Sequence, residues 1–268
     1  MPELPEIETI SRQLQTITNN VITNISYNKN IKLRLPLDNS LDQILFQTII
    51  KISRRAKYLI IQLTNGYLII HLGMSGKLLL QVTSSAINRK HDHIVINLSN
   101  NHSLYYNDPR RFGCVIYRNN LDCLKHLALE PFDHNLNAQY LLQKLANKTT
   151  NIKTSILNGN IIVGVGNIYI SEALYKAKIH PLRTANSLNL LECQQLLIAI
   201  KQVLLLAINH GGSSFQDFLN IKGQKGQATH YLSVYNNNGH NCSHCGQLIT
   251  SIRIQNRNTF FCSNCQKL

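Results

Sequence analysis

Residues 58–72 read YLIIQLTNGYLIIHL, two apolar runs on either side of Thr64-Asn65-Gly66. Both runs are rich in β-branched and aromatic residues, which favour extended strands. Asn-Gly is the dipeptide best suited to the positive backbone angles of a tight hairpin turn. This stretch therefore predicts an antiparallel hairpin with strands at Tyr58–Leu63 and Tyr67–Leu72.

The sequence around this hairpin carries the same signals to about residue 118. A second predicted hairpin joins His93–Leu98 to Ser103–Tyr106 through Ser99-Asn100-Asn101. Another strand is expected at Cys114–Arg118, after Asp108-Pro109, because proline interrupts the hydrogen bonding of a sheet. Short antiparallel strands in this number are typical of a β-sandwich.

Helical periodicity lies on both sides of this strand-rich region. Near the N-terminus, apolar residues at helical spacing predict one buried stripe: Leu4, Ile7, Ile10, Leu14 and Ile17. Beyond residue 121 we expect four helices, at Ala138–Lys148, Lys153–Leu157, Tyr169–Ala177 and Leu188–Asn209. Asn186 or Ser187 is the expected cap of the last helix.

The expected fold class is α+β, in three parts. Residues 1–131 form an N-terminal helix and an antiparallel β-sandwich, residues 132–235 a helical domain, and residues 236–268 a short cysteine-bearing module. The polar run after Glu130-Pro131 is the predicted linker between the first two.

The chain is strongly basic. It carries 27 Lys+Arg against 13 Asp+Glu, a formal net charge of +14. Such an excess favours a polyanionic partner such as nucleic acid, although a basic surface that merely aids solubility remains the alternative. We expect no transmembrane helix and no secretion signal, because polar residues interrupt the apolar runs and the start MPELPEIE is acidic.

Four of the seven cysteines form two pairs near the C-terminus, Cys242-Ser-His-Cys245 and Cys262-Ser-Asn-Cys265. A gap of two residues lets both thiolates of a pair bind one metal, and two pairs complete a tetrahedral sulfur site that favours Zn²⁺. Because protein fills all four positions, the predicted role is structural. Predicted strands Ile252–Ile254 and Thr259–Phe261 lie between the pairs, with Arg257 at the hairpin tip, where it is free to bind phosphate.

The N-terminus offers a different chemistry. Removal of Met1 exposes the secondary amine of Pro2, and an α-amino group has a pKa near 8 against roughly 10.4 for lysine. Its neutral form is able to attack a sugar carbon and form an iminium, with the neighbouring Glu3 as an acid–base group. Alone the pair is weak, because a Met-Pro start is common and Glu3 also suits the start of a helix.

Further motifs give the chain a family resemblance. Its start, MPELPEIETI, resembles that of formamidopyrimidine-DNA glycosylases, bacterial enzymes that remove 8-oxoguanine and ring-opened purines. The other matches follow in the family's order: RRAKYL at 54–59, HLGMSG at 71–76, KHDH at 90–93, YNDPRRFG at 106–113, GVGNIY at 164–169, SEAL at 171–174, IHPLRTANSL at 179–188, GGSSFQDF at 211–218 and the four cysteines. The resemblance covers essentially the whole chain.

This resemblance implies roles for particular residues. Pro2 attacks C1′ of the damaged nucleotide, Glu3 acts at the ribose oxygen, and Lys57 contacts phosphate and supports the elimination that nicks the strand. The metal is one structural Zn²⁺ on Cys242, Cys245, Cys262 and Cys265, and no organic cofactor is implied. The partner is damaged double-stranded DNA, without a membrane. The protein is expected to be a cytoplasmic, nucleoid-associated bacterial monomer.

The resemblance also implies a device that fills the hole left by a flipped base. Phe112 is expected to wedge beside the opposite strand, Met74 to fill the vacated space and Arg110 to read the orphaned base. Asn167, at the start of a helix–two-turn–helix, and His71 match phosphate contacts of the family. Three of these residues have a simpler interpretation. Met74 or Phe112 could pack in the core, and His71 could be a strand histidine that is hydrogen-bonded within the protein.

The sequence departs from the family pattern at several positions. Gln227-Ala228-Thr229 replaces an aromatic-bearing stretch in the loop where the family reads the flipped base, so catalysis is better supported than lesion preference. Lys178 replaces a common glycine, and Glu172 in the SEAL match has an open role. Two alternatives remain: an endonuclease VIII-type enzyme for oxidised pyrimidines, and a zinc-ribbon DNA-binding protein that does not cut. Leu4 together with Met74, Arg110 and Phe112 favours the purine enzyme.

Overall fold

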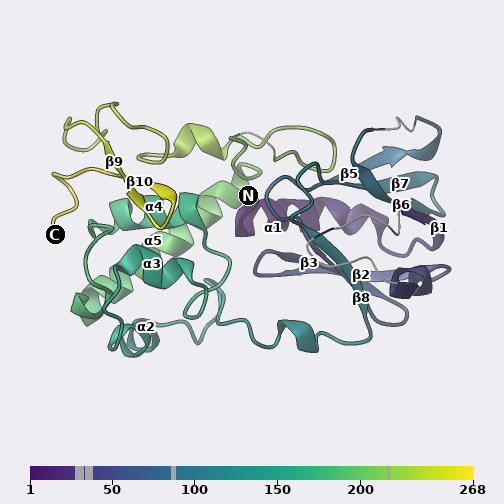
Figure 1. The fold of residues 1–268 in the computed structure, drawn as a ribbon, viewed down its shortest axis with the longest axis horizontal. Helices are drawn as coiled ribbons and strands as arrows, with labels where there is room; N and C mark the ends of the chain where they lie inside the picture. Colours follow the sequence, from purple (N-terminus) through teal and green to yellow (C-terminus); the bar gives the residue numbers. More distant parts are fainter. Residues whose placement is uncertain (28–32, 34–38, 86–88, 216–217) are drawn as a thin grey trace. The chain divides into compact units, whose positions relative to one another are not determined.

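The computed structural model describes residues 1–27, 33, 39–85, 89–215 and 218–268 (Figure 1). The chain forms two compact units. The first comprises Met1–His126 and Ile208–Thr229, and the second Leu127–Ala207 and His230–Leu268. The segment 208–229 thus belongs to the sandwich unit, whereas the sequence places it with the helical domain; its hydrogen bonds to α1 and β5 explain the difference.

The first unit begins with α1, Leu4–Gln13, which continues as the 3₁₀ turn Leu14–Ile17. All five residues of the predicted apolar stripe are at most 1% exposed, so this prediction is confirmed. A capping box starts the helix: the Glu3 side chain accepts the Glu6 N–H, and the Glu6 side chain accepts the Glu3 N–H.

Two four-stranded antiparallel sheets form the sandwich, with α1 packed into their shared core. One sheet has the order β1 (Ile22–Tyr27), β6 (Asp92–Leu98), β7 (His102–Asn107) and β5 (Lys77–Val82). The other has the order β2 (Ile49–Arg55), β3 (Tyr58–Leu63), β4 (Tyr67–His71) and β8 (Cys114–Arg118). Short 3₁₀ turns lie at Asn39–Ile44, Thr83–Ser85 and Asp122–Leu124.

Both predicted hairpins are present. Strands β3 and β4 pair from Tyr58 opposite His71 to Gln62 opposite Tyr67, and Gly66 has the positive φ of +78° that the turn requires. Strands β6 and β7 pair antiparallel across the second predicted turn. The α+β class and the antiparallel sandwich are therefore confirmed.

The second unit holds α2 (Ala138–Leu145), α3 (Ile152–Leu157), α4 (Asn167–Lys176) and most of α5 (Leu190–Asn209). The turns between α3 and α4 contain Gly159 and Gly164, both with positive φ. A hairpin of β9 (Thr250–Ile254) and β10 (Arg257–Phe261) packs against α4. Two 3₁₀ turns, Ala185–Ser187 and Ala228–Tyr231, complete the described elements.

Helix α5 begins differently from the prediction. The Asn189 side chain accepts the Glu192 N–H, and Glu192 accepts the Asn189 N–H, so Asn189 is the cap rather than Asn186 or Ser187. Among the described residues, α5 is the one helix long and apolar enough to cross a membrane. Length and composition alone are weak evidence, so this finding assigns no membrane span.

Candidate functional site

The start of α1 is a buried polar cluster. Pro2 and Glu3 are both buried, while Met1 is exposed. The Glu3 N–H donates to Glu6 Oε2 at 2.7 Å, and Glu6 is only 1% exposed. These contacts fix the backbone that carries Pro2, so the first residues of the chain are ordered rather than frayed.

A distant loop closes over this cluster. The Ser213 N–H and hydroxyl both donate to Glu6 Oε1, at 2.6 and 3.1 Å. A Cβ on Gly212 would lie 2.9 Å from Glu6 Oε1, so the close approach needs glycine. Gln227-Ala228-Thr229, the stretch that departs from the family pattern, also lies beside Gly212, because the Ala228 N–H donates to Gly212 O. The loop that follows α5 is thus fixed to the element that carries Pro2 and Glu3.

Asp108, which is fully buried, organises two turns of the sandwich. Its Oδ1 accepts the Ser75 hydroxyl at 2.7 Å, and its Oδ2 accepts the Gly113 N–H at 2.9 Å and the Tyr106 hydroxyl at 3.1 Å. Burial, and then the Asp108 charge, raises the pKa of Tyr106, so its hydroxyl stays a donor. The Ser75 hydroxyl in turn accepts the Arg110 N–H. One carboxylate therefore joins the turn after β4 to the turn before β8.

These two turns display the three predicted void-filling side chains. The backbones pack directly, because a Cβ on Gly73 would lie 2.4 Å from the Phe112 carbonyl carbon. Met74 is 38% and Phe112 47% exposed, and the Arg110 guanidinium lies 5.1 Å from the Phe112 ring centroid. Met74 and Phe112 are therefore surface residues, not core residues. The turns at residues 72–76 and 109–113, joined through Asp108, are called the Asp108 platform below.

Asp108→Asn is expected to loosen this platform. The asparagine amide would turn its NH₂ group toward at least one of the three groups that donate to Asp108, and two donors cannot bond each other. A buried polar group left without a partner lowers the free energy of unfolding by about 1–3 kcal/mol. Hydrogen exchange should accelerate in residues 72–76 and 109–113. Asp122→Asn is the matched control, because that carboxylate is exposed and its ion pair with Lys125 lies on the surface. Equal exchange in both variants would contradict the role of Asp108.

Lys57 and His71 lie at the same end of the second sheet. Lys57 follows Ala56, whose φ of +53° forms the turn between β2 and β3. The next residue, Tyr58, pairs with His71, and their ring centroids are 4.9 Å apart. His71 Nδ1 accepts the Gly73 N–H, so this histidine supports the turn that carries Met74.

In the second unit, Asn167 and Arg257 are brought together. Asn167 is the first residue of α4, and its Nδ2 donates to the Asn258 carbonyl at 3.0 Å. Its Oδ1 is buried without a hydrogen-bond partner among the described residues. Arg257 begins β10 opposite Ile254, and the hairpin tip is instead Gln255-Asn256, both with positive φ. The helix start and the exposed arginine therefore border one surface.

Two buried groups hold the second unit together. Glu172 accepts the N–H groups of Ser233, Val234 and Tyr235 at 2.7–2.9 Å, and burial raises its pKa against the opposing effect of these bonds. Lys153, also fully buried, donates to the Thr259 hydroxyl at 2.7 Å and thereby ties β10 to α3. Glu172 thus has a structural role, which its place in the SEAL motif alone does not reveal.

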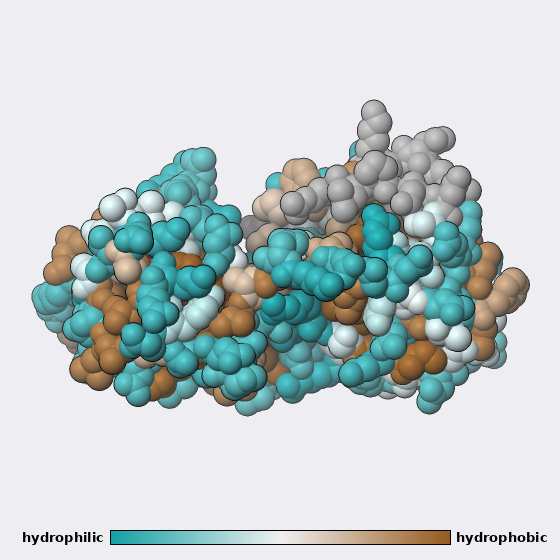
Figure 2. Space-filling model, turned by 90° about the horizontal axis from the view of Figure 1, so that it is seen from below, coloured by the Kyte–Doolittle hydropathy of each residue, from teal (hydrophilic) through white to brown (hydrophobic). Residues whose placement is uncertain are grey.

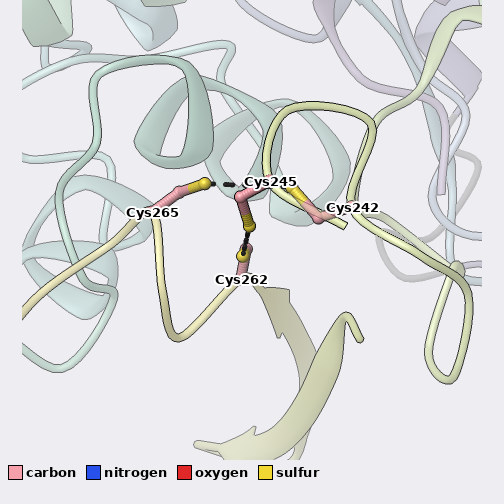
Figure 3. A group of neighbouring side chains, drawn as sticks. All are labelled: Cys242, Cys245, Cys262 and Cys265. Carbon is pink, nitrogen blue, oxygen red and sulfur yellow. Dashed lines mark hydrogen bonds between the residues drawn. The ribbon is translucent and has the colours of Figure 1, made fainter. Parts of the chain in front are cut away.

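The four predicted zinc cysteines converge (Figure 3). All four sulfur atoms lie within 4.8 Å of one another, with Cys245–Cys262 at 3.5 Å and Cys242–Cys265 at 3.8 Å. A tetrahedron with Zn–S bonds of about 2.3 Å has sulfur–sulfur edges of roughly 3.8 Å, so the cluster has the size of a zinc site. The Tyr175 hydroxyl lies 3.1 Å from Cys242 Sγ, an outer contact that orients this ligand.

Three supporting residues, Asp108, Glu6 and Lys153, are not predicted by the sequence reasoning. Asp108 stands inside a quoted motif, but its position before proline indicates only the end of a strand. Glu6 is recognisable as the fourth residue of a capping box that begins at Glu3. Lys153 has no sequence signal, because a lysine in a helix is normally solvated.

Comparison with known proteins agrees with this geometry. Residues 1–115 match the model of the formamidopyrimidine-DNA glycosylase N-terminal domain, and residues 127–218 that of the formamidopyrimidine-DNA glycosylase H2TH domain. Residues 239–268 match the zinc finger found in FPG and IleRS, so the four cysteines hold one structural zinc ion.

Whole-chain relatives extend the match. A formamidopyrimidine-DNA glycosylase of Shigella dysenteriae serotype 1 is 42% identical over 276 residues, covering all of both chains. A Lactococcus lactis FPG mutant bound to Fapy-dG-containing DNA has a TM-score of 0.90 at 33% identity, again over all of both chains. The wild-type Lactococcus lactis FPG bound to DNA with an oxidised pyrimidine has a TM-score of 0.89 at 34% identity. The chain belongs to the formamidopyrimidine-DNA glycosylase family.

Proposed function

We propose that this glycosylase excises oxidised purines from duplex DNA by attack of the Pro2 amine and then nicks the strand. The observation that carries the proposal is the Asp108 platform, which holds Met74, Arg110 and Phe112 out to solvent. An enzyme that acts at C1′ must first take the base out of the stack and must then fill the hole. Exposed apolar side chains beside an arginine on a rigid turn suit that task.

The reaction begins when the Pro2 nitrogen lone pair forms a bond to C1′. The bond from C1′ to the damaged base breaks, and its electron pair leaves with the base, which takes up a proton. The attached Pro2 nitrogen gives up its remaining proton, Glu3 protonates the ribose ring oxygen, and the nitrogen lone pair opens the ring to leave an iminium between Pro2 and C1′. The buried contacts among Glu3, Glu6 and Ser213 support this assignment, because they keep the amine and its acid in one fixed place.

Strand cleavage then follows by elimination. Loss of a proton from C2′ expels the 3′ phosphate, and a second elimination expels the 5′ phosphate. The iminium accepts the electrons at each stage. Lys57, in the turn beside Tyr58 and His71, would contact the phosphate and assist these steps.

In the second unit, backbone phosphate is the expected ligand of Asn167 and Arg257. The Asn167 Nδ2 donor, which bonds the Asn258 carbonyl in this structure, and the exposed Arg257 lie beside the N-terminus of α4, where free N–H groups favour anions. The zinc ion stabilises the hairpin that carries Arg257. We further propose that the protein acts as a monomer in the bacterial cytoplasm, in association with the nucleoid. We also propose residues 1–131, 132–235 and 236–268 as its functional domains, with residues 208–229 of the second packed into the first compact unit.

A damage panel tests the lesion preference. We expect kcat/KM for 8-oxoguanine opposite cytosine to exceed that for thymine glycol by at least about tenfold, because hydrogen-bonding sites discriminate strongly between bases. Cleavage of an abasic site in the same duplex controls for intact lyase chemistry. A preference for thymine glycol would instead support the endonuclease VIII-type alternative.

A further inference from the structure

Helix α5 exposes an unusual number of large aliphatic side chains. Five of them are at least 39% exposed: Leu190, Leu191, Ile198, Leu205 and Leu206. Only 44% of the most apolar 18-residue stretch of this helix is buried, whereas a core helix is mostly buried. Monomeric proteins rarely leave such apolar surface uncovered without a binding role.

Three of these residues form one regular stripe. Leu191, Ile198 and Leu205 are seven residues apart, so they lie on the same face of the helix, about 10.5 Å from one to the next. Between them the exposed positions are amides, including Gln195 and Gln202. This row supplies one apolar position in each heptad, which is half of the seam that a second helix packs against, because Gln194 and Lys201 occupy the alternate positions.

A groove of about 600 Å³ runs beside this stripe. Its walls are α5 and the segment that leads into the first turn of α2, and its lining includes His134, Leu190, Ile198 and Lys201. In Figure 2, hydrophobic side chains gather at the left end of the molecule, where Figure 1 places α2 and α5. Stripe and groove together offer a concave apolar site within the second unit.

The charges of the groove residues indicate which kind of ligand would bind there. Lys201 is the cation of the groove, His134 lies at its edge, and none of the described lining residues is acidic. A second copy fits poorly, since α5 itself carries only one carboxylate, Glu192, which is already bound by Arg183. DNA fits poorly too, because a stripe of leucine, isoleucine and glutamine offers one lysine for phosphate.

We propose that this groove binds an acidic amphipathic helix of a partner protein. Apolar side chains of the partner at positions i, i+3 or i+4, and i+7 would fill the groove and pack on Leu191, Ile198 and Leu205. A carboxylate on its flank would pair with Lys201. This site is separate from the residues assigned to base excision, so the two proposals stand or fall independently.

Two synthetic peptides of about 18 residues, long enough to form a helix, test the proposal. Both carry leucine at positions i, i+3 and i+7; one has glutamate elsewhere and the other lysine. Their fluorescence anisotropy is measured with the full-length, zinc-loaded chain without DNA, and undamaged duplex is then added only to the complex of the acidic peptide. The acidic peptide should bind at least about tenfold more tightly than the basic one, and the duplex should not displace it.

Variants then locate the site. Ile198→Glu should weaken binding of the acidic peptide at least about tenfold, since it places a charge on apolar surface that the peptide would cover. Val82→Glu, at an equally exposed apolar residue of the first unit, is the matched control. Lys201→Glu should reverse the order of the two peptides, whereas Lys148→Glu, an equal charge change outside the groove, should not. Retained zinc and base excision in each variant would establish that it is folded.

Several results would overturn the proposal. These are no binding of the acidic peptide, equal binding of both peptides, displacement by duplex, or full affinity in Ile198→Glu. Concentration-dependent self-association that Ile198→Glu abolishes in sedimentation velocity would assign the face to a second copy instead.

Discussion

Pro2→Gly is expected to lose the covalent adduct that borohydride traps on lesion-containing DNA. Hydride adds to the carbon–nitrogen double bond of the iminium and makes the link between protein and C1′ permanent. If Pro2 supplies that nitrogen, the adduct forms on the first residue of the mature chain. Peptide mapping of the reduced complex should therefore find the sugar on Pro2.

The physical reason lies in the proline ring. A secondary amine forms an iminium that is positively charged without taking up a proton, so it draws electrons at once in each later elimination. The ring also restricts the backbone, whereas glycine is free to turn. Both losses act on the transition state, so the single-turnover rate should fall by about a thousandfold even though a primary amine remains.

Two controls make the experiment decisive. Pro5→Ala changes the neighbouring proline in the first turn of α1 and should keep the adduct, because alanine suits a helix. Intact-mass measurement of both variants must find Met1 removed, since otherwise residue 2 has no free amine. An undiminished adduct in Pro2→Gly would exclude Pro2 as the nucleophile, and the absence of any adduct in the native chain would favour the non-cutting alternative.

The sequence predicted the centre of the sandwich better than its edges. The predicted strands of the sandwich correspond to β3, β4, β6, β7 and β8, four of which lie between two neighbours in their sheets. The three strands without a prediction, β1, β2 and β5, are all edge strands. Strands β1 and β2 mix polar with apolar residues and therefore lack the continuous apolar run that identifies a buried strand, whereas β5 has such a run at Leu78–Leu80 that the prediction did not use.

For the site, the sequence supplied the reacting groups but not their supports. Zinc ligands and a nucleophile are recognisable from residue type and spacing, and those positions needed no tertiary information. Asp108 is recognisable only once Ser75, 33 residues earlier, lies beside it. Lys178 illustrates the same limit: its φ of +59° explains why glycine is common there, yet a left-handed lysine is not evident from the chain.

Cys262→Ser is expected to release the zinc ion and unfold residues 239–268, called the zinc ribbon here, while leaving the sandwich intact. Cys262 is fully buried, and the ribbon has only a small apolar core of its own, comprising Val234, Cys242, Ile249, Phe260 and Cys262. Structural zinc contributes about 10–16 kcal/mol to the folding of such modules, far more than so small a core provides. The first unit has a separate core and should be unaffected.

Metal content and hydrogen exchange measure this directly. The native chain should hold one zinc ion and the variant none, with rapid exchange over residues 239–268 and native protection over residues 49–63. Cys123→Ser is the matched control, because Cys123 is exposed and lies outside the cluster. It should keep both the zinc ion and the protection.

Unfolding of the zinc ribbon should also weaken binding of duplex DNA. The Asn258 carbonyl holds the Asn167 amide, so unfolding of the hairpin removes Arg257 and releases Asn167 at once. Because two phosphate-binding side chains are then displaced together, affinity should fall by about ten- to a hundredfold, measured by anisotropy at fixed salt. Full affinity in a zinc-free Cys262→Ser protein would mean that the ribbon is not part of the DNA-binding surface. Weak binding with retained zinc would instead place the defect outside the metal site.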